Sequence, residues 1–170
     1  MNFSRKELIQ SDATMNQMRN AIYELARLME RNGTADLSSR LRRMGQEIAK
    51  TFINYWKPTE SVTLINIRDL ITTIYQKVLN SSISIEVEEK SNSIKVRDNN
   101  CALCKYHYED IEIAGCEIVI GMVSEIISQI NRESNKPSSL YLEPLEIEES
   151  RAYGNNTCIQ VYKYKIGGTD

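Results

Sequence analysis

Residues 100–130 read NCALCKYHYEDIEIAGCEIVIGMVSEIISQI, and this stretch carries most of the rare chemistry of the chain. It contains three of the four cysteines and the only histidine, His107. After Ala114 and Gly115 it becomes the most apolar run in the sequence. Apolar residues there cover more than half of the circumference of a helix over 116–131, so we expect a helix buried on most sides. A small cysteine site beside a core helix is therefore the first expectation.

The totals of the sequence describe one globular domain. The 170 residues, 41% hydrophobic and 26% charged, fit a single domain over 1–170 with a substantial core. The formal net charge of −2 provides no basic field for nucleic acid or an anionic membrane surface. No apolar run reaches the roughly 18 residues that suggest a membrane span, and the first residues lack a secretory signal. We therefore expect a cytoplasmic protein without a transmembrane segment, whose cysteines are thiols or metal ligands rather than disulfides.

The spacing of apolar residues predicts three helices in the first half. A helix capped by Ser11 or Asp12 should end at Asn32 and Gly33. Helices over 35–56 and 62–79 follow from the same three-and-four spacing. Gly45 interrupts the second of these helices at a cost of about 1 kcal/mol against alanine, and Gly121 interrupts the helix over 116–131. Glycines at such positions indicate the close approach of another backbone.

Alternating apolar residues predict two β-hairpins. Ile83, Ile85 and Val87 alternate with polar residues, and Ile94 and Val96 belong to the return strand. Strands over 140–147 and 158–166 should form the second hairpin, and residues 111–113 could form a short strand. The order is three helices, a hairpin, a helix and a hairpin. This order predicts an α+β domain of packed helices with two antiparallel hairpins.

The cysteines are the candidate site. Cys101 and Cys104 have the spacing of half a zinc site, because two thiolates on one short loop can occupy adjacent corners of a tetrahedron. Cys116 and Cys158 could complete the site, and His107 is a competing ligand. The residues alone leave three alternatives open, which are a metal site, small thiols without metal, and a disulfide.

Signals of enzyme chemistry are absent from the sequence. It has no phosphate-cradling glycine loop and no GxSxG turn, and nothing locates a base and an orienting group for a cysteine nucleophile. We therefore expect no catalytic residues and no enzymatic activity. The basic residues of the second helix are mixed with acidic ones, which is typical of a solvated face, while an anion or partner site is the alternative; they are Arg40, Arg42, Arg43 and Lys50.

Three motifs mark the second half of the chain. They are Cys101-Ala-Leu-Cys104, then Gly115-Cys116 with Gly121, and 150–158, SRAYGNNTC. This half resembles the 4-vinyl reductase domain family, whose members carry paired cysteines, then a glycine-cysteine that opens a helix with an internal glycine, and finally a Cys-Arg-Ala-x-Gly-x-x-x-Cys turn. The segment 41–48, LRRMGQEI, is similar to the second helix of that superfamily and of its eukaryotic relatives, the TRAPP core subunits. The resemblance covers about residues 18–166.

The resemblance implies an α+β fold of the TRAPP-subunit or 4-vinyl reductase type, often dimeric, that binds small apolar molecules. It also implies a cysteine-based zinc site in some members. Ser150 stands where the family usually has cysteine, so Cys101, Cys104, or a carboxylate such as Glu146 or Glu148 would have to substitute. TRAPP subunits often hold an acylated cysteine before the third helix, whereas residues 59–64 contain none, which disfavours covalent acylation.

Two functional hypotheses follow. The first is a non-enzymatic, homodimeric domain that binds a small apolar ligand, hydrocarbon or lipid-like, with a structural zinc site formed by Cys101, Cys104, Cys116 and Cys158. The second is a TRAPP-like interaction or scaffold subunit that works through contacts with other proteins.

Overall fold

The computed structural model describes residues 4–56, 61–134 and 139–167. Three helices precede the first hairpin, in the order α1 (Arg5–Arg31), α2 (Leu37–Phe52) and α3 (Ile67–Ile74), with α3 continuing into a π-helical turn, η1 (Tyr75–Leu79). The first hairpin consists of β1 (Ile83–Glu88) and β2 (Ser93–Asp98). The long helix α4 (Cys116–Ser134) leads to β3 (Leu140–Glu149), a short 3-10 turn η2 (Arg151–Tyr153), and β4 (Cys158–Ile166).

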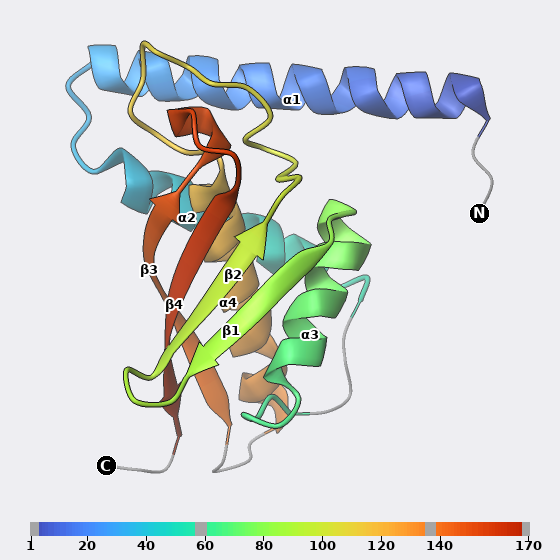
Figure 1. The fold of residues 1–170 in the computed structure, drawn as a ribbon, viewed down its shortest axis with the longest axis vertical. Helices are drawn as coiled ribbons and strands as arrows, with labels where there is room; N and C mark the ends of the chain where they lie inside the picture. The colour runs from blue at the N-terminus through green and yellow to red at the C-terminus, as the bar shows by residue number, and fades with distance from the viewer. Residues whose placement is uncertain (1–3, 57–60, 135–138, 168–170) are drawn as a thin grey trace.

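The strands form one antiparallel sheet in the order β1-β2-β4-β3. Both predicted hairpins are therefore confirmed, and pairing of β2 with β4 joins them into a single sheet. Helix α4 packs against β3 and β4 on one side and against α2 on the other, while α1 runs across one end of the molecule (Figure 1). The α+β class and the packing of helices on antiparallel strands agree with the expectation from sequence. Among the described residues, no helix is both long and apolar enough to cross a bilayer.

Helix α1 begins seven residues earlier than a cap at Ser11 would place it, because its N-cap is Ser4. Ser4 caps it by accepting the backbone N–H of Glu7, and the Glu7 carboxylate accepts the N–H of Ser4 in return. This capping box satisfies two free donors of the first turn, so the helix does not need Ser11 or Asp12 as its cap. The predicted end is confirmed, because Asn32 caps the last turn and Gly33 has a left-handed φ of 67°.

Glycine brings α2 and α4 into backbone contact. A Cβ added to Gly45 of α2 would lie 2.0 Å from the carbonyl oxygen of Ile118, and one added to Gly121 of α4 would lie 2.1 Å from that of Arg42. The close approach that both glycines indicated is therefore confirmed. The helix predicted over 35–56 is shorter at both ends: Asp36 is its N-cap and its last turn is at Phe52.

The predicted helix over 62–79 and strand over 111–113 differ from the structure. Residues before Ile67 do not continue the helix, because the backbone of Val62 bonds instead to the Asn131 side chain and to Leu140. Ile111 and Ile113 are buried but belong to a loop without strand pairing. Their alternation with Glu112 comes from packing one side of the loop on the core, which a period of two cannot distinguish from a strand.

Candidate metal centre

All four cysteines converge on one buried point. Cys101 and Cys104 lie in the loop between β2 and α4, Cys116 is the first residue of α4, and Cys158 is the first residue of β4. Their Sγ atoms all lie within 4.8 Å of one another, and every one of the four side chains is buried. None of them forms a disulfide. The structure therefore brings together the four residues that the sequence suggested.

The spacing of the four sulfurs suits a single ion. In a regular tetrahedron, the distance from the centre to a corner is the edge length divided by about 1.63. Edges of at most 4.8 Å therefore place the sulfurs no more than about 2.9 Å from a shared centre. Zinc–thiolate bonds are about 2.3 Å long, so each sulfur would need to move inward by no more than about 0.6 Å. Shifts of this size are within reach of cysteine side chains. The donor set therefore fits one tetrahedrally coordinated metal ion.

The loop that carries Cys101 and Cys104 is fastened to the β3–β4 connection. The backbone N–H of Tyr108 donates to the carbonyl oxygen of Ala152, and His107 Nδ1 lies 2.9 Å from the same oxygen. Thr157 donates its hydroxyl to the carbonyl oxygen of Asp98. These bonds hold the loop beside the first residues of β4. As a result, Cys101 and Cys104 share one site with Cys158, which follows them by 54 or more positions, although no local pattern in the sequence links them.

Polar donors surround the sulfurs. Cys104 Sγ accepts the N–H of Cys116 at 3.2 Å and the Tyr23 hydroxyl at 3.8 Å. The Tyr23 oxygen in turn accepts the N–H of Gly115 at 2.9 Å. Cys158 Sγ accepts the N–H of Arg151 at 3.4 Å. Donors of this kind stabilise negative charge on sulfur, and outer-shell hydrogen bonds of the same kind accompany metal ligands generally.

The thiols of the metal-free cluster differ in acidity. Burial alone would raise the pKa of Cys104, but hydrogen bonds from Cys101 and Cys116 outweigh it and hold this pKa well below its usual range. A hydrogen bond with Cys101 lowers the pKa of Cys158. The hydrogen bond with Cys104 is the main cause that raises the pKa of Cys101, and hydrogen bonds with Cys101 and Cys104 raise that of Cys116, because a bond donated by a neutral thiol is lost when the thiol ionises. A bound cation would favour the ionised form of the thiols.

Ser150 occupies the edge of the cluster. Its Oγ lies 3.9 Å from Cys116 Sγ and 3.8 Å from Cys158 Sγ, and it accepts the N–H of Ala152. The position is fully buried. Ser150 is therefore adjacent to the sulfurs. Four thiols are present without it, because Cys101 and Cys104 join Cys116 and Cys158.

The other candidate ligands lie outside the cluster. His107 is not among the groups that the described residues bring together for a metal, and its Nδ1 is engaged by Ala152. Glu148 forms an ion pair with Lys95. Sequence reasoning also missed Tyr23, which reaches Cys104 from α1, 81 residues away. No pattern in the sequence connects a helix tyrosine to a distant cysteine, so only the fold could reveal it.

Comparison with known proteins gives the fold but not the family. No known protein family matches the sequence, and no curated protein does. The structure is similar to that of trafficking protein particle complex subunit 3 from Naegleria fowleri, which is covalently bound to palmitic acid. The TM-score is 0.66 at 10% identity, over 93% of this chain and 99% of the other. The chain therefore has a TRAPP-subunit-like fold.

A second solved structure, from work on heme redox potential and protein-induced porphyrin distortion, gives a TM-score of 0.43 at 11% identity. The match covers 98% of this chain and 73% of the other, and a score that low does not establish a shared fold. The resemblance to the 4-vinyl reductase domain family stays a prediction.

Proposed function

We propose that this chain is a non-catalytic binding domain built around one structural zinc ion. The observation that carries the proposal is the convergence of Cys101, Cys104, Cys116 and Cys158, all buried, on one tetrahedral space. Four thiolates leave no open coordination position for a substrate, which is typical of structural rather than catalytic zinc. Soft thiolate ligands also disfavour calcium and magnesium, which take oxygen.

In this proposal the ion supplies four bonds that tie together three segments of the chain. Cys116 belongs to the first turn of α4, Cys158 is the first residue of β4, and Cys101 and Cys104 belong to the loop between β2 and α4. Backbone N–H groups of Cys116 and Arg151 and the Tyr23 hydroxyl support the charge on two of the sulfurs. Because the unfolded chain lacks a preformed site, the free energy of metal binding becomes free energy of folding.

Thermal unfolding with and without zinc tests this proposal. We expect the melting temperature of the reduced protein to fall when a strong chelator removes the metal, and to recover when zinc is added back. Cys116→Ser and Cys158→Ser should abolish the recovery, whereas His107→Gln should keep it because His107 lies outside the cluster. A melting temperature that the chelator does not change would contradict the proposal.

We propose further that the domain binds a small apolar or lipid-like molecule without a covalent bond. The support is the shared fold with a subunit that holds palmitic acid. A thioester is disfavoured because the four cysteines belong to the cluster and residues 59–64 contain none. The wide apolar face of α4 does not itself argue for a ligand, because α2 and the sheet pack against it. Lipid extraction and native mass spectrometry of the purified protein test this part, and a protein that never carries or takes up such a molecule would contradict it.

Exposed apolar side chains favour a second candidate function, that of a dimeric interaction module. Several lie along α1 and others in the segments that follow α2 and precede α3, namely Ile9, Met18, Leu25, Leu28, Tyr55 and Ile65. Met18, Leu25 and Leu28 follow one another at spacings of seven and three, so they share one face of α1, and exposed apolar residues gathered on one face are typical of interaction surfaces. Size-exclusion chromatography with light scattering tests this candidate. A homodimer that Leu25→Asp together with Leu28→Asp converts to monomer supports it, and a monomer at all concentrations contradicts it.

A further inference from the structure

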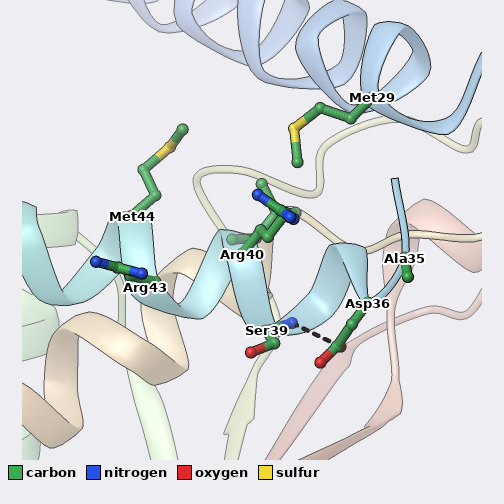
Figure 2. Close-up of a pocket in the computed structure, with 8 residues that line it drawn as sticks. Met29, Ala35, Asp36, Ser39, Arg40, Arg43 and Met44 are labelled. Atoms are coloured by element: carbon green, nitrogen blue, oxygen red, sulfur yellow. Dashed lines mark hydrogen bonds between the residues drawn. The ribbon is translucent and has the colours of Figure 1, made fainter. Parts of the chain in front are cut away.

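A surface groove lies between the last turns of α1 and the first half of α2. Its volume is about 520 Å³, which is within the range of small-molecule sites. Met29 enters it from α1, and Leu41 and Met44 line it from α2. Figure 2 shows Met29 descending from α1 and Arg40 rising from α2 toward the same space. The groove is separate from the cysteine cluster, since none of its lining residues belongs to that site.

One side of the groove is apolar and adaptable. Leu41 is buried and forms part of the core, while Met29 and Met44 are half-buried and keep part of their surface free. Methionine side chains are flexible and polarisable, so they can adjust to the irregular shape of an alkyl chain. This side of the groove therefore suits an apolar chain rather than a flat polar ligand.

The other side carries two arginines without an ion-pair partner among the described residues. Arg40 and Arg43 are exposed and lie one helical turn apart, and among the described residues neither makes an ion pair or a side-chain hydrogen bond. The neighbouring Arg42 behaves differently, since it bonds to Glu117 and to the carbonyl oxygen of Pro144. Of the four basic residues of α2, Arg42 therefore has a packing role and Lys50 pairs with Glu47, while Arg40 and Arg43 line the groove.

The local negative charges are already engaged. Asp36 lines the groove, but its carboxylate caps α2 by accepting the N–H of Ser39 at 3.2 Å, as the dashed line in Figure 2 marks. Glu47, the acidic neighbour of Arg43, forms an ion pair with Lys50 at 2.8 Å, and Lys50 lowers the pKa of Glu47 more than Arg43 does. The groove lining therefore keeps a net charge of +1 from two arginines and one aspartate.

We infer that this groove binds a fatty acid in its carboxylate form, with the head group on Arg40 and Arg43 and the chain along Met29, Leu41 and Met44. Guanidinium groups bind carboxylates through charge-assisted hydrogen bonds, and an apolar floor next to them matches the two parts of an anionic amphiphile. The inference rests on the proposed ligand-binding function and names the ligand class and the place for it. It does not depend on the metal.

Titration calorimetry with monomeric decanoate and with 1-decanol tests the inference on the purified protein. We expect decanoate to bind more tightly than decanol. The double variant Arg40→Gln with Arg43→Gln should weaken decanoate binding about tenfold or more and leave decanol binding unchanged. A matched control, Arg97→Gln with Lys77→Gln, removes two exposed positive charges away from the groove and should leave both affinities unchanged. Met44→Trp, which fills the groove, should weaken both ligands.

The outcomes separate this inference from the function on which it rests. Equal loss of decanoate binding in the double variant and in the control pair would overturn the inference, and so would no loss in either. Binding of decanol without decanoate would overturn it too, yet leave the proposed apolar ligand intact. Binding of neither molecule would overturn both. Metal content and melting temperature of every variant confirm that the protein under test is folded.

Discussion

The Cα of Gly45 in α2 faces the backbone of Ile118 in α4 so closely that a Cβ there would lie 2.0 Å from the Ile118 carbonyl oxygen. In the same way, a Cβ added to Gly121 of α4 would lie 2.1 Å from the carbonyl oxygen of Arg42 in α2. Helices α2 and α4 are thereby packed backbone to backbone, close to Cys116, the first residue of α4. Because Ile118 lies two residues after Cys116, this contact helps to fix the first turn of α4, which carries that cysteine.

Adding a methyl group at Gly45 should therefore force the helices apart. Gly45→Ala should destabilise the protein by about 3 kcal/mol, since the clash is with backbone atoms that cannot rotate away. On an exposed helix the same change would be stabilising by about 1 kcal/mol, so the sign distinguishes packing from propensity. Urea unfolding at fixed zinc measures it, with Gln46→Ala on the same helix as the control. A Gly45→Ala variant that is more stable than the parent would contradict the packing of α2 on α4.

The ion pair between Arg42 and Glu117 fastens the same two helices. The Glu117 carboxylate is nearly buried and accepts Arg42 Nε at 2.6 Å. Glu117→Gln should cost about 3 kcal/mol, because it leaves the guanidinium without its counter-charge in a largely desolvated place. The exposed pair of Lys165 and Glu143 is the control, and Glu143→Gln should cost less than about 1 kcal/mol. Equal effects of the two substitutions on the free energy of unfolding would show that the α2–α4 pair is no more than a surface contact.

Ser150 offers a test by rescue at the metal centre. Its Oγ is already 3.8 Å and 3.9 Å from two of the sulfurs, which is close to the separation of about 3.8 Å between thiolates on one zinc ion. Cys101→Ser should lose the metal or bind it far more weakly. Cys101→Ser combined with Ser150→Cys should regain one zinc per chain, measured by elemental analysis after gel filtration. If the combined variant stays metal-free while it remains folded, Ser150 does not share the coordination space.

Asp98 gives the stability a defined pH dependence. Burial raises its pKa, and the hydrogen bonds from Ser81 and Asn100 offset this only in part. Because the folded pKa lies above the unfolded value of about 3.9, the proton stabilises the fold. That contribution is complete below the unfolded pKa and is lost as the pH rises through the folded one. Its Oδ2 atom also lacks a hydrogen bond among the described residues.

Asp98→Asn removes this titration. The difference in unfolding free energy between variant and parent, measured without metal from about pH 3.5 upward, should move in favour of the variant as the pH rises. A difference that stays constant over this range would show that Asp98 has an ordinary pKa. A change of opposite sign would show that the pKa of Asp98 is lowered in the folded protein.

Local patterns in the sequence were enough for most elements. Gly33 ended α1 as expected, and the two interior glycines marked the helix contact, since glycine has few other reasons to occupy such positions. The start of α1 was missed because Ser4 and Glu7 precede the first apolar repeat, although the capping box itself is a local signal. Helix α3 was placed too early because the pairing of Val62 with Asn131 and Leu140 overrides its local propensity.

The candidate site was predictable in its residue types and not in its arrangement. Cysteine is rare enough that Cys101, Cys104, Cys116 and Cys158 could be named as one set. Their convergence depends on the pairing of β2 with β4, which joins Asp98 to Cys158 across 60 positions of the chain. Neither the Tyr23 hydroxyl nor the place of Ser150 beside the sulfurs follows from any spacing. Such contacts are set by the tertiary fold.

Native mass spectrometry of the purified, reduced protein, with elemental analysis of the same sample, shows whether the four cysteines hold a zinc ion. We predict a mass that exceeds the sequence mass by one zinc ion per chain. We also predict that the four thiols resist alkylation until a chelator is added. A folded protein of the metal-free mass whose cysteines react without a chelator would contradict a structural zinc ion, as would a mass that requires a multinuclear iron–sulfur cluster.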